Sequence, residues 1–458
     1  MKAISRYFRR DLLPILADLR LAIVLLLVIA IACATGTFVE QGETVQYYQA
    51  TYPESPARFG FLTWKVLLAL SLNRVYQATW FLSLLILFGA SLAACTVTRQ
   101  WPMLKVARRW SYYKRPESFK KFALSASLPS GELDDFEASL KQQRYLTFRE
   151  GNKLYARKGI VGKIGPIVVH ASMLLVLAGA IWGSLSGYKV QEMIPAGTIS
   201  PIRNAIEVGS LANKLPDWEL KVNRFWIDYA DDGRVKQFYS DLSVIDGGEE
   251  AERKTIFVNE PLKYKGVTLY QADWSVDSVV VRINRSPAFR LPLQPLRQPG
   301  GNKLWGTFVP TKPDMSEGLT MLVPDFQGTA LIYGKDGNLV GPMRAGGSID
   351  VDGQTIYLDD LIGATGLQIK SDPGIPLVYA GFGLLMLGVM MSYVSHSQIW
   401  ALQEDSNLYV GGKTNRALVT FEREFCRLLD RISPASTDTV NADSSAADSL
   451  STTIAQES

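Results

Sequence analysis

The chain has 458 residues, of which 47% are hydrophobic and 20% charged, and its net charge is +4. This balance indicates a membrane protein with a large water-soluble part and excludes a disordered chain, which would be poor in apolar residues. The three cysteines, Cys33, Cys95 and Cys426, are scattered and form no CxxC motif.

The basic residues 1–20 precede an apolar segment at 21–39, which we predict to be the first membrane span. Positive charge before a span places that end in the cytoplasm. The triplet Ala32-Cys33-Ala34 resembles a signal-peptide cleavage site, so cleavage is an alternative, but we favour a retained helix.

Residues 40–78 are predicted to be an extracytoplasmic loop. Its apolar run Phe61–Leu72 is too short to span and carries Lys65, which indicates an interfacial or packed helix. A second span is predicted at 79–98, and the basic residues that follow it place this end in the cytoplasm.

Residues 99–161 are predicted to form a small cytoplasmic module of β-α-β-β type. Its helix covers 131–143, with acidic residues that favour the N-terminal end of a helix. The two strands after this helix make a hairpin that turns at 150–152.

The predicted third span, 162–187, carries His170 inside its apolar run, and Lys163 lies at its cytoplasmic start. An ionisable residue within a membrane is costly and points to a function, although His170 could also serve as hydrogen-bonding glue between helices. At about 100° per residue, two sets of residues take opposite faces. The histidine face carries Lys163, Pro166, Leu174, Leu177 and Ile181, and the other face carries the glycine stripe Gly179, Gly183 and Gly187, where another helix can approach closely.

Residues 188–373 alternate in strand-like patterns with turn signals and contain no cysteine. They are predicted to form a large extracytoplasmic all-β domain, a sandwich or barrel without disulfides. The fourth span, 374–395, contains glycines that favour close packing. His396 follows its cytoplasmic end and is predicted to be solvated or at the lipid headgroups.

Residues 396–432 are predicted to be a cytoplasmic segment with an amphipathic helix that docks on the module or on the membrane. The Ser/Thr/Asp/Ala-rich tail 433–458 is predicted to be disordered. The expected fold class is therefore a polytopic α-helical membrane protein with four transmembrane helices, a large extracytoplasmic all-β domain and a small cytoplasmic α+β module.

Chemistry-bearing motifs are sparse. The sequence has no P-loop, no glycine-rich nucleotide fingerprint and no soluble cluster of histidines with carboxylates. A single imidazole can hold haem iron from one side, with the second ligand supplied by another helix or protein. A bis-histidine haem would need a partner chain or a bend that brings His396 inward.

Several segments in this order resemble the CcsB/ResB-type family of cytochrome c biogenesis proteins, known as System II, especially its cyanobacterial and plastid branch. The resemblance covers most of the chain apart from the extreme N-terminus and the tail. It is carried by ATGTFVEQGE, RVYQATWFLSLL, AACTVTR, GPIVVHASMLLVLAGAIWG, VNEPLKYKGVTLYQADW, DPGIPLVYAGFGLLMLGVMMSYVSHSQIWA and YVGGKTNRA.

The resemblance implies a subunit that works with the membrane protein CcsA to deliver haem b across the membrane and attach it to apocytochromes c, among them cytochrome f and soluble lumenal c-type cytochromes. His170 matches the family's haem-iron ligand, and Lys163 is our candidate contact for a haem propionate. The chain lacks the tryptophan-rich segment of CcsA, so it is not expected to be catalytic alone, only as part of a haem–apocytochrome c lyase complex.

The implied setting is a thylakoid or plasma membrane with the β domain on the lumenal or periplasmic side. A thioredoxin-like thiol reductant is a further candidate partner, and no nucleic acid is expected. Three other functions compete with haem delivery. The first is a scaffold that holds CcsA and apocytochrome without binding haem, and the others are a transporter and a transmembrane sensor. The lack of inverted repeats and of output motifs argues against the last two.

Overall fold

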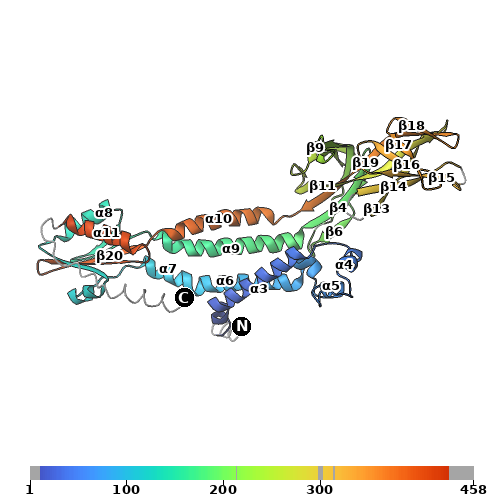
Figure 1. Cartoon of the computed structure of the whole chain (residues 1–458). Coiled ribbons are helices and arrows are strands. Elements are labelled where there is room, and N and C mark those ends of the chain that lie inside the picture. The colour runs from blue at the N-terminus through green and yellow to red at the C-terminus, as the bar shows by residue number, and fades with distance from the viewer. Residues whose placement is uncertain (1–10, 213, 298–302, 313–314, 433–458) are drawn as a thin grey trace. The chain divides into compact units, whose positions relative to one another are not determined.

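A computed structural model of the protein describes residues 11–212, 214–297, 303–312 and 315–432 (Figure 1). The basic residues before Asp11 and the predicted disordered tail 433–458 lie outside this range. The chain divides into two compact units. Unit 1 contains residues 1–35, 79–180 and 376–458, and unit 2 contains 36–78 and 181–375.

Within the residues that the structure describes, four helices are long and apolar enough to cross a membrane, as the sequence predicts. Many of their large apolar side chains are exposed, for example Leu27 on the first helix and Met390 on the last, as expected for surfaces that meet lipid. The helices are α3 (Leu19–Phe38), the continuous segment Thr79–Arg108, α9 (Val161–Ser186) and α10 (Ile375–Tyr393).

The second of these helices continues ten residues past the predicted end at 98. It consists of α6 (Thr79–Cys95), a π-helical turn η3 (Thr96–Gln100) and α7 (Trp101–Arg108). Pro102, in the first turn of α7, has no N–H, and its ring crowds the carbonyl four residues earlier. A locally widened turn accommodates such a proline, and π turns of this kind are frequent at functional sites.

Helices α9 and α10 run side by side (Figure 1). A Cβ atom added at Gly388 of α10 would lie 2.9 Å from the backbone nitrogen of Val169, and one at Gly381 would lie 3.0 Å from that of Val176. This pair therefore packs backbone against backbone, which only small residues permit. The close approach follows the α9 face of Gly165, Val169 and Val176, and not the predicted glycine stripe.

Unit 1 also contains an antiparallel five-stranded sheet of order β1-β21-β20-β3-β2. The predicted β-α-β-β pattern supplies three of its strands and α8 (Leu133–Gln142). Two of its three inner strands, β21 and β20, come from the chain beyond α10, a segment for which the sequence predicts no strand. The strands are β1 (Leu124–Pro129), β2 (Leu146–Glu150), β3 (Lys153–Lys158), β20 (Ser397–Glu404) and β21 (Asn407–Thr414).

Alternation along these strands gives the sheet two apolar faces. Ile399 and Ala401 of β20 pack in a core with α8 and α11 (Leu418–Asp430), whereas Trp400 lies among aromatic residues on the other face. Phe421 and Phe425 of α11 are buried in the first of these cores. The amphipathic helix thus docks on the sheet, one of its two expected positions.

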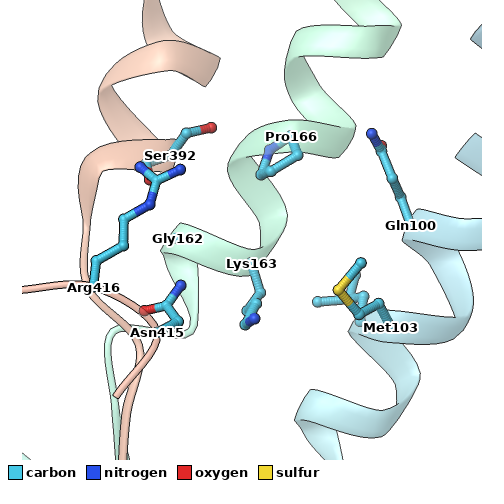
Figure 2. A pocket seen from close by; sticks show the side chains of 9 residues that line it. Gln100, Met103, Gly162, Lys163, Pro166, Ser392, Asn415 and Arg416 are labelled. Atoms are coloured by element: carbon cyan, nitrogen blue, oxygen red, sulfur yellow. The ribbon is translucent and has the colours of Figure 1, made fainter. Parts of the chain in front are cut away.

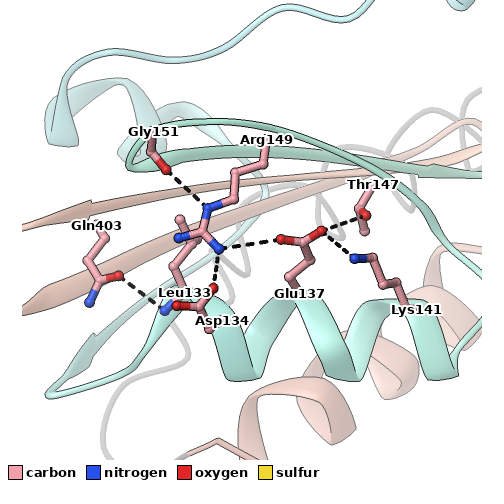
Figure 3. Close-up of polar contacts among 8 residues, drawn as sticks. All are labelled: Leu133, Asp134, Glu137, Lys141, Thr147, Arg149, Gly151 and Gln403. Atoms are coloured by element: carbon pink, nitrogen blue, oxygen red, sulfur yellow. Dashed lines mark hydrogen bonds and ion pairs between the residues drawn. The ribbon is translucent and has the colours of Figure 1, made fainter.

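Polar contacts hold α8 on the sheet (Figure 3). The Leu133 N–H donates to the Gln403 amide oxygen at 3.1 Å, which caps the start of the helix. Glu137 accepts from Lys141 at 2.7 Å and from the Thr147 hydroxyl at 3.0 Å. Arg149 adds ion pairs with Asp134 and Glu137. Because Gln403 belongs to β20, the start of α8 receives this capping hydrogen bond only from a strand that follows α10.

Unit 2 is β-rich, as predicted. It contains a seven-stranded sheet with the path β10-β11-β19-β4-β6, to which β12 and β18 are added, a five-stranded sheet β13-β14-β15-β16-β17 and a four-stranded sheet β5-β7-β8-β9. Its strands are β4 (Tyr188–Pro195), β5 (Ile199–Pro201), β6 (Ala205–Val208), β7 (Glu219–Tyr229), β8 (Val235–Asp246), β9 (Glu249–Phe257), β10 (Leu262–Tyr264), β11 (Val267–Ile283), β12 (Phe289–Pro292), β13 (Gln294–Arg297), β14 (Lys303–Pro310), β15 (Gly318–Val323), β16 (Thr329–Tyr333), β17 (Leu339–Arg344), β18 (Gly347–Val351) and β19 (Gln354–Ser371).

The long strands β11 and β19 connect two separate cores. Their Leu269 and Ile369 pack against the four-stranded sheet, and their Val279 and Leu358 pack against the five-stranded sheet. Unit 2 is therefore two sandwiches that share one pair of strands. Between the cores, buried Ser240, Gln271 and Thr365 hydrogen-bond to one another at 2.6–2.8 Å.

Residues 36–78 of unit 2 fold into the short helices α4 (Val45–Thr51), α5 (Trp64–Ala69) and η2 (Leu72–Gln77). Leu67 of α5 is fully buried with Tyr48 and Val39. The predicted interfacial or packed helix is thus packed, while Lys65 stays exposed and pairs with Glu54 at 2.9 Å.

Candidate functional site

His170 is the tenth residue of α9, about 14 Å along the helix axis from its start. Its half-buried ring contacts the π turn of the neighbouring helix through both nitrogens. Nδ1 lies 3.0 Å from the Thr96 hydroxyl, and Nε2 lies 3.0 Å from the Gln100 amide nitrogen. The two partners are four residues apart, so one turn of the second helix holds the whole imidazole edge.

The contacts of the Thr96 hydroxyl favour one tautomer of the His170 ring. A threonine hydroxyl has one proton, and that of Thr96 is donated to the Leu92 carbonyl at 2.8 Å. Thr96 therefore accepts from the Nδ1–H of His170, which leaves Nε2 unprotonated with a lone pair. Gln100 donates an amide N–H to that lone pair. A neutral imidazole held through Nδ1–H is the form that metal-ligating histidines adopt.

A cavity of about 170 Å³ lies in unit 1. Figure 2 shows α9 between the segment that carries Gln100 and the segment that carries Asn415 and Arg416. Gln100 belongs to this cavity and also contacts His170. The cavity is lined by Gln100, Met103, Leu104, Gly162, Lys163, Pro166, Ser392, Asn415 and Arg416.

The cavity has a positive lining. Lys163 and Arg416 are its charged residues, and it has no carboxylate. The Arg416 guanidinium donates to the Ser392 carbonyl at 2.8 Å, and across the described ranges neither cation forms an ion pair with an acidic residue. Such a lining favours an anionic group. Its volume is below the roughly 300–1,000 Å³ of pockets that enclose a whole ligand, so it suits a carboxylate or phosphate group.

The structure places the predicted site residues as follows. Lys163 lines the cavity and His170 contacts a residue of it, so the two share one neighbourhood. Leu174 and Leu177, which the sequence places on the histidine face, pack against Phe88 and Leu92 of α6 and Leu25 of α3. The histidine face is therefore partly occupied by this chain's own helices.

His396 differs from its prediction. It is not solvated but buried, with 3% of its surface exposed. Its main-chain N–H donates to the Asn415 side chain at 2.7 Å, and its Nδ1–H donates to the Lys158 carbonyl at 3.2 Å. Burial lowers the pKa of His396, and the positive Lys163 and Arg157 lower it further. The strands beyond α10 fold over this residue, which the sequence reading did not expect.

Sequence reasoning missed Thr96, Gln100 and Arg416. Thr96 lies two residues before the predicted end of the second span and Gln100 two residues past it. The available signal is Pro102, which follows the π turn in the first turn of α7. Arg416 belongs to the motif YVGGKTNRA, which was recognised only as a family marker. Within the described ranges there is no group of three or more histidine, cysteine or acidic side chains that could hold a metal ion.

The chain is similar over most of its length to curated proteins that share one name. A cytochrome c biogenesis protein CcsB of Synechococcus sp. (strain JA-2-3B'a(2-13)) is 62% identical over 441 residues, which cover 94% of both chains. Proteins of the same name from Synechococcus elongatus and Thermosynechococcus vestitus are 57% and 54% identical, over 91% and 94% of this chain and 92% and 98% of theirs.

Among solved structures, a cytochrome c haem lyase CcmF matches with a TM-score of 0.23 and 11% identity, over 72% of this chain and 34% of that one. A likeness this low supports no argument about fold or function. The model of the ResB-like family matches residues 19–298 and 352–426, which is most of the chain. The protein therefore belongs to the ResB-like family.

Proposed function

We propose that this chain is the membrane subunit of a cytochrome c biogenesis complex, in which His170 binds the iron of haem in transit to apocytochromes c. The proposal rests on the family and on one observation, the hydrogen-bonded His170 ring with its Nε2 lone pair unprotonated. In this role haem is cargo, passed on by covalent attachment to the client.

The residues around His170 fit an iron ligand. Nδ1–H is committed to Thr96, so the ring is held in one orientation and Nε2 is the nitrogen left to bind a metal. Lys163 lies two turns of helix, about 10 Å, before His170, and with Arg416 it gives the nearby cavity a positive charge. A haem propionate carries the charge and size that this cavity accepts.

The ring of haem exceeds the cavity, and Leu174 and Leu177 are packed against α3 and α6. We therefore propose that a second membrane protein, CcsA, covers most of the haem and supplies the other axial ligand and the attachment chemistry. We assign the joining of haem to the client thiols to the complex with CcsA. Reduction of the client thiols is assigned to a thioredoxin-like protein.

The proposed orientation follows from charge. Basic residues flank the first span, the end of the second and the start of α9, so these ends face the cytoplasm or stroma. Unit 2 then extends into the thylakoid lumen or the periplasm, where cytochrome f and soluble c-type cytochromes receive haem. Its sandwiches are assigned to binding CcsA, apocytochrome or both.

The alternative that keeps most of these observations is a scaffold that holds CcsA and apocytochrome without binding haem. The hydrogen bonds of His170 to Thr96 and Gln100 join α9 to the second helix, as a structural histidine would. An asparagine or glutamine at position 170 should then preserve function, which iron ligation does not allow.

The deciding experiment is an absorption spectrum of the chain co-purified with CcsA, for the wild type and for His170→Ala, with His396→Ala as the matched control. We expect the Soret band to be lost or shifted in His170→Ala while CcsA still co-purifies, and to persist in the control. Equal bands in the wild type and His170→Ala would refute the ligand assignment and leave the scaffold.

A further inference from the structure

The nitrogen of His170 that would bind iron is already occupied within the chain. The Gln100 amide nitrogen lies 3.0 Å from Nε2 and donates to its lone pair. An iron atom and an amide N–H cannot use the same lone pair. Any ligand that binds Nε2 must therefore displace the Gln100 side chain.

Gln100 is poorly satisfied in this position. Its amide oxygen is buried and has no hydrogen-bond partner among the residues that the structure describes. An unpaired buried acceptor is unfavourable, which offsets part of what the bond to His170 contributes. The arrangement in which Gln100 contacts Nε2 is therefore stabilised by one hydrogen bond to His170 and destabilised by the unpaired amide oxygen of Gln100.

The chain also provides room for Gln100 to move. Gln100 lines the cavity that contains Lys163 and Arg416, on the side of α9 seen in Figure 2. A side chain that left Nε2 could enter this polar space, where the Asn415 side chain and water offer partners for the amide oxygen. Gln100 is the last residue of the π turn Thr96–Gln100, which departs from regular helix geometry.

Thr96, in contrast to Gln100, favours the form of His170 that can bind a ligand through Nε2. Its hydroxyl is held by the Leu92 carbonyl and can only accept from His170, so it keeps the proton on Nδ1. Without this acceptor the proton could move to Nε2 and block ligation. Thr96 positions the ring and its proton and does not touch the ligand.

We propose that Gln100 is a displaceable cap on the iron-binding nitrogen of His170, and that Thr96 is the positioning residue that keeps this nitrogen unprotonated. The inference rests on the proposed function, since it assigns Nε2 to iron. It predicts that the chain exists in a capped form and an open form and that only the open form takes haem. The apparent affinity is then reduced by the fraction that is open.

The first test is a haem titration of the full chain in complex with CcsA, with the spectrum as readout. Gln100→Ala removes the cap, so we expect haem to bind about two- to tenfold more tightly than in the wild type, the range that one net hydrogen bond provides. Gln100→Leu, which keeps the bulk without the donor, should change affinity in the same direction. Gln142→Ala on the exposed surface of α8 is the matched control and should leave affinity unchanged.

The second test needs no haem. The chain has only two histidines, so ¹⁵N labelling of histidine gives two imidazole rings with two nitrogen signals each, which His396→Ala assigns. We expect His170 to carry its proton on Nδ1 in the wild type and in Thr96→Ser. In Thr96→Val, which removes the acceptor but keeps the shape, a second tautomer with the proton on Nε2 should appear.

The outcomes separate this inference from the proposed function. If His170→Ala binds haem like the wild type, His170 is not the iron ligand, and Gln100 is then not a cap on an iron-binding nitrogen. If His170→Ala loses haem but both Gln100 variants bind as the wild type does, the function stands and the cap is refuted. A wild-type proton on Nε2 would refute the role of Thr96.

Discussion

The guanidinium of Arg157 on β3 donates to the main-chain oxygen of Arg108, the last residue of α7, at 2.8 Å. A second bond reaches the Ala107 carbonyl at 3.0 Å. The last carbonyls of a helix lack hydrogen-bond partners within it and carry its partial negative charge. A cation there both donates to these carbonyls and interacts favourably with that charge. This contact ties the end of the second membrane helix to the sheet of unit 1.

We therefore expect Arg157→Ala to lower the free energy of unfolding by about 2 kcal/mol, because hydrogen bonds from a charged donor contribute about 1.5–3 kcal/mol. Thermal unfolding of the purified chain measures the change. Arg149→Ala is the control, since its ion pair with Asp134 is exposed and that with Glu137 is longer, at 3.5 Å. These pairs should contribute about 1 kcal/mol or less. Equal losses of unfolding free energy in the two variants would show that the bonds from Arg157 to the end of α7 contribute no more than the ion pairs of Arg149.

Two glycines that lie two residues apart on α10 should differ in how well they tolerate a larger side chain. Gly381→Val would drive its Cβ into Val176 of α9, at 2.6 Å from a side-chain carbon, whereas Gly383 has nothing within 4 Å of an added Cβ. Gly381→Val should separate the helices and cost about 1–3 kcal/mol, the usual range for overpacking. Gly383→Val should be close to neutral. Comparison of their unfolding temperatures in detergent decides the point.

The polar cluster between the two cores of unit 2 should be sensitive to the loss of one member. Thr365 is fully buried and bonds both Ser240 and Gln271. Thr365→Val keeps the shape but removes the hydroxyl that both partners contact, while the bond between Ser240 and Gln271 remains. We therefore expect a loss of about 1–3 kcal/mol. Thr320→Val, on an exposed position of β15, is the control and should cost little. Chemical denaturation followed by tryptophan fluorescence measures both variants.

Acid should destabilise unit 1 through His396. Its folded pKa is depressed by burial and by Lys163 and Arg157, while the unfolded chain binds a proton near pH 6.5. The unfolded state therefore takes up more protons, so stability is full above about pH 6.5 and is lost as the pH falls through the folded pKa. Unfolding temperatures across this interval should fall less steeply in His396→Gln. An unchanged slope in that variant would place the acid sensitivity elsewhere.

Removing charge from the cavity should weaken haem retention if the cavity binds a propionate. We expect Lys163→Gln to lower the affinity for haem by about fivefold, near 1 kcal/mol, because the half-buried lysine is partly screened by solvent. The effect should shrink at high salt. Lys105→Gln, an exposed lysine of α7 outside the cavity, is the control. If both variants retain haem equally, the propionate contact is wrong.

The sequence predicts the four long apolar helices and the β-rich region, because both signals are local. A run of about 20 apolar residues is recognisable without its neighbours, and so is the alternation of unit 2. His170 was recognisable for the same reason, as an ionisable residue within an apolar run. Its contacts were not, because Thr96 and Gln100 belong to a different helix.

The errors arise where distant segments meet. Strands β20 and β21 were missed because their partners, β3 and β1, precede two membrane helices in the sequence. The burial of His396 was missed for the same reason, since the segment that covers it had no assigned structure. Pairing across such distances depends on side chains such as Tyr155 and Trp400, whose rings lie 5.5 Å apart and leave no periodic signal.

The strand order of the unit 1 sheet has a consequence for synthesis on the ribosome. The inner strands β20 and β21 are translated after all of unit 2, whereas β1, β2 and β3 emerge before α9. Until residue 414 has been made, β1 and β3 each present an edge without its partner, and such edges invite pairing with other chains. A nascent chain stalled within unit 2 should therefore need a chaperone on the incomplete unit 1 sheet. A truncation before β20 should aggregate even though it retains all four long apolar helices.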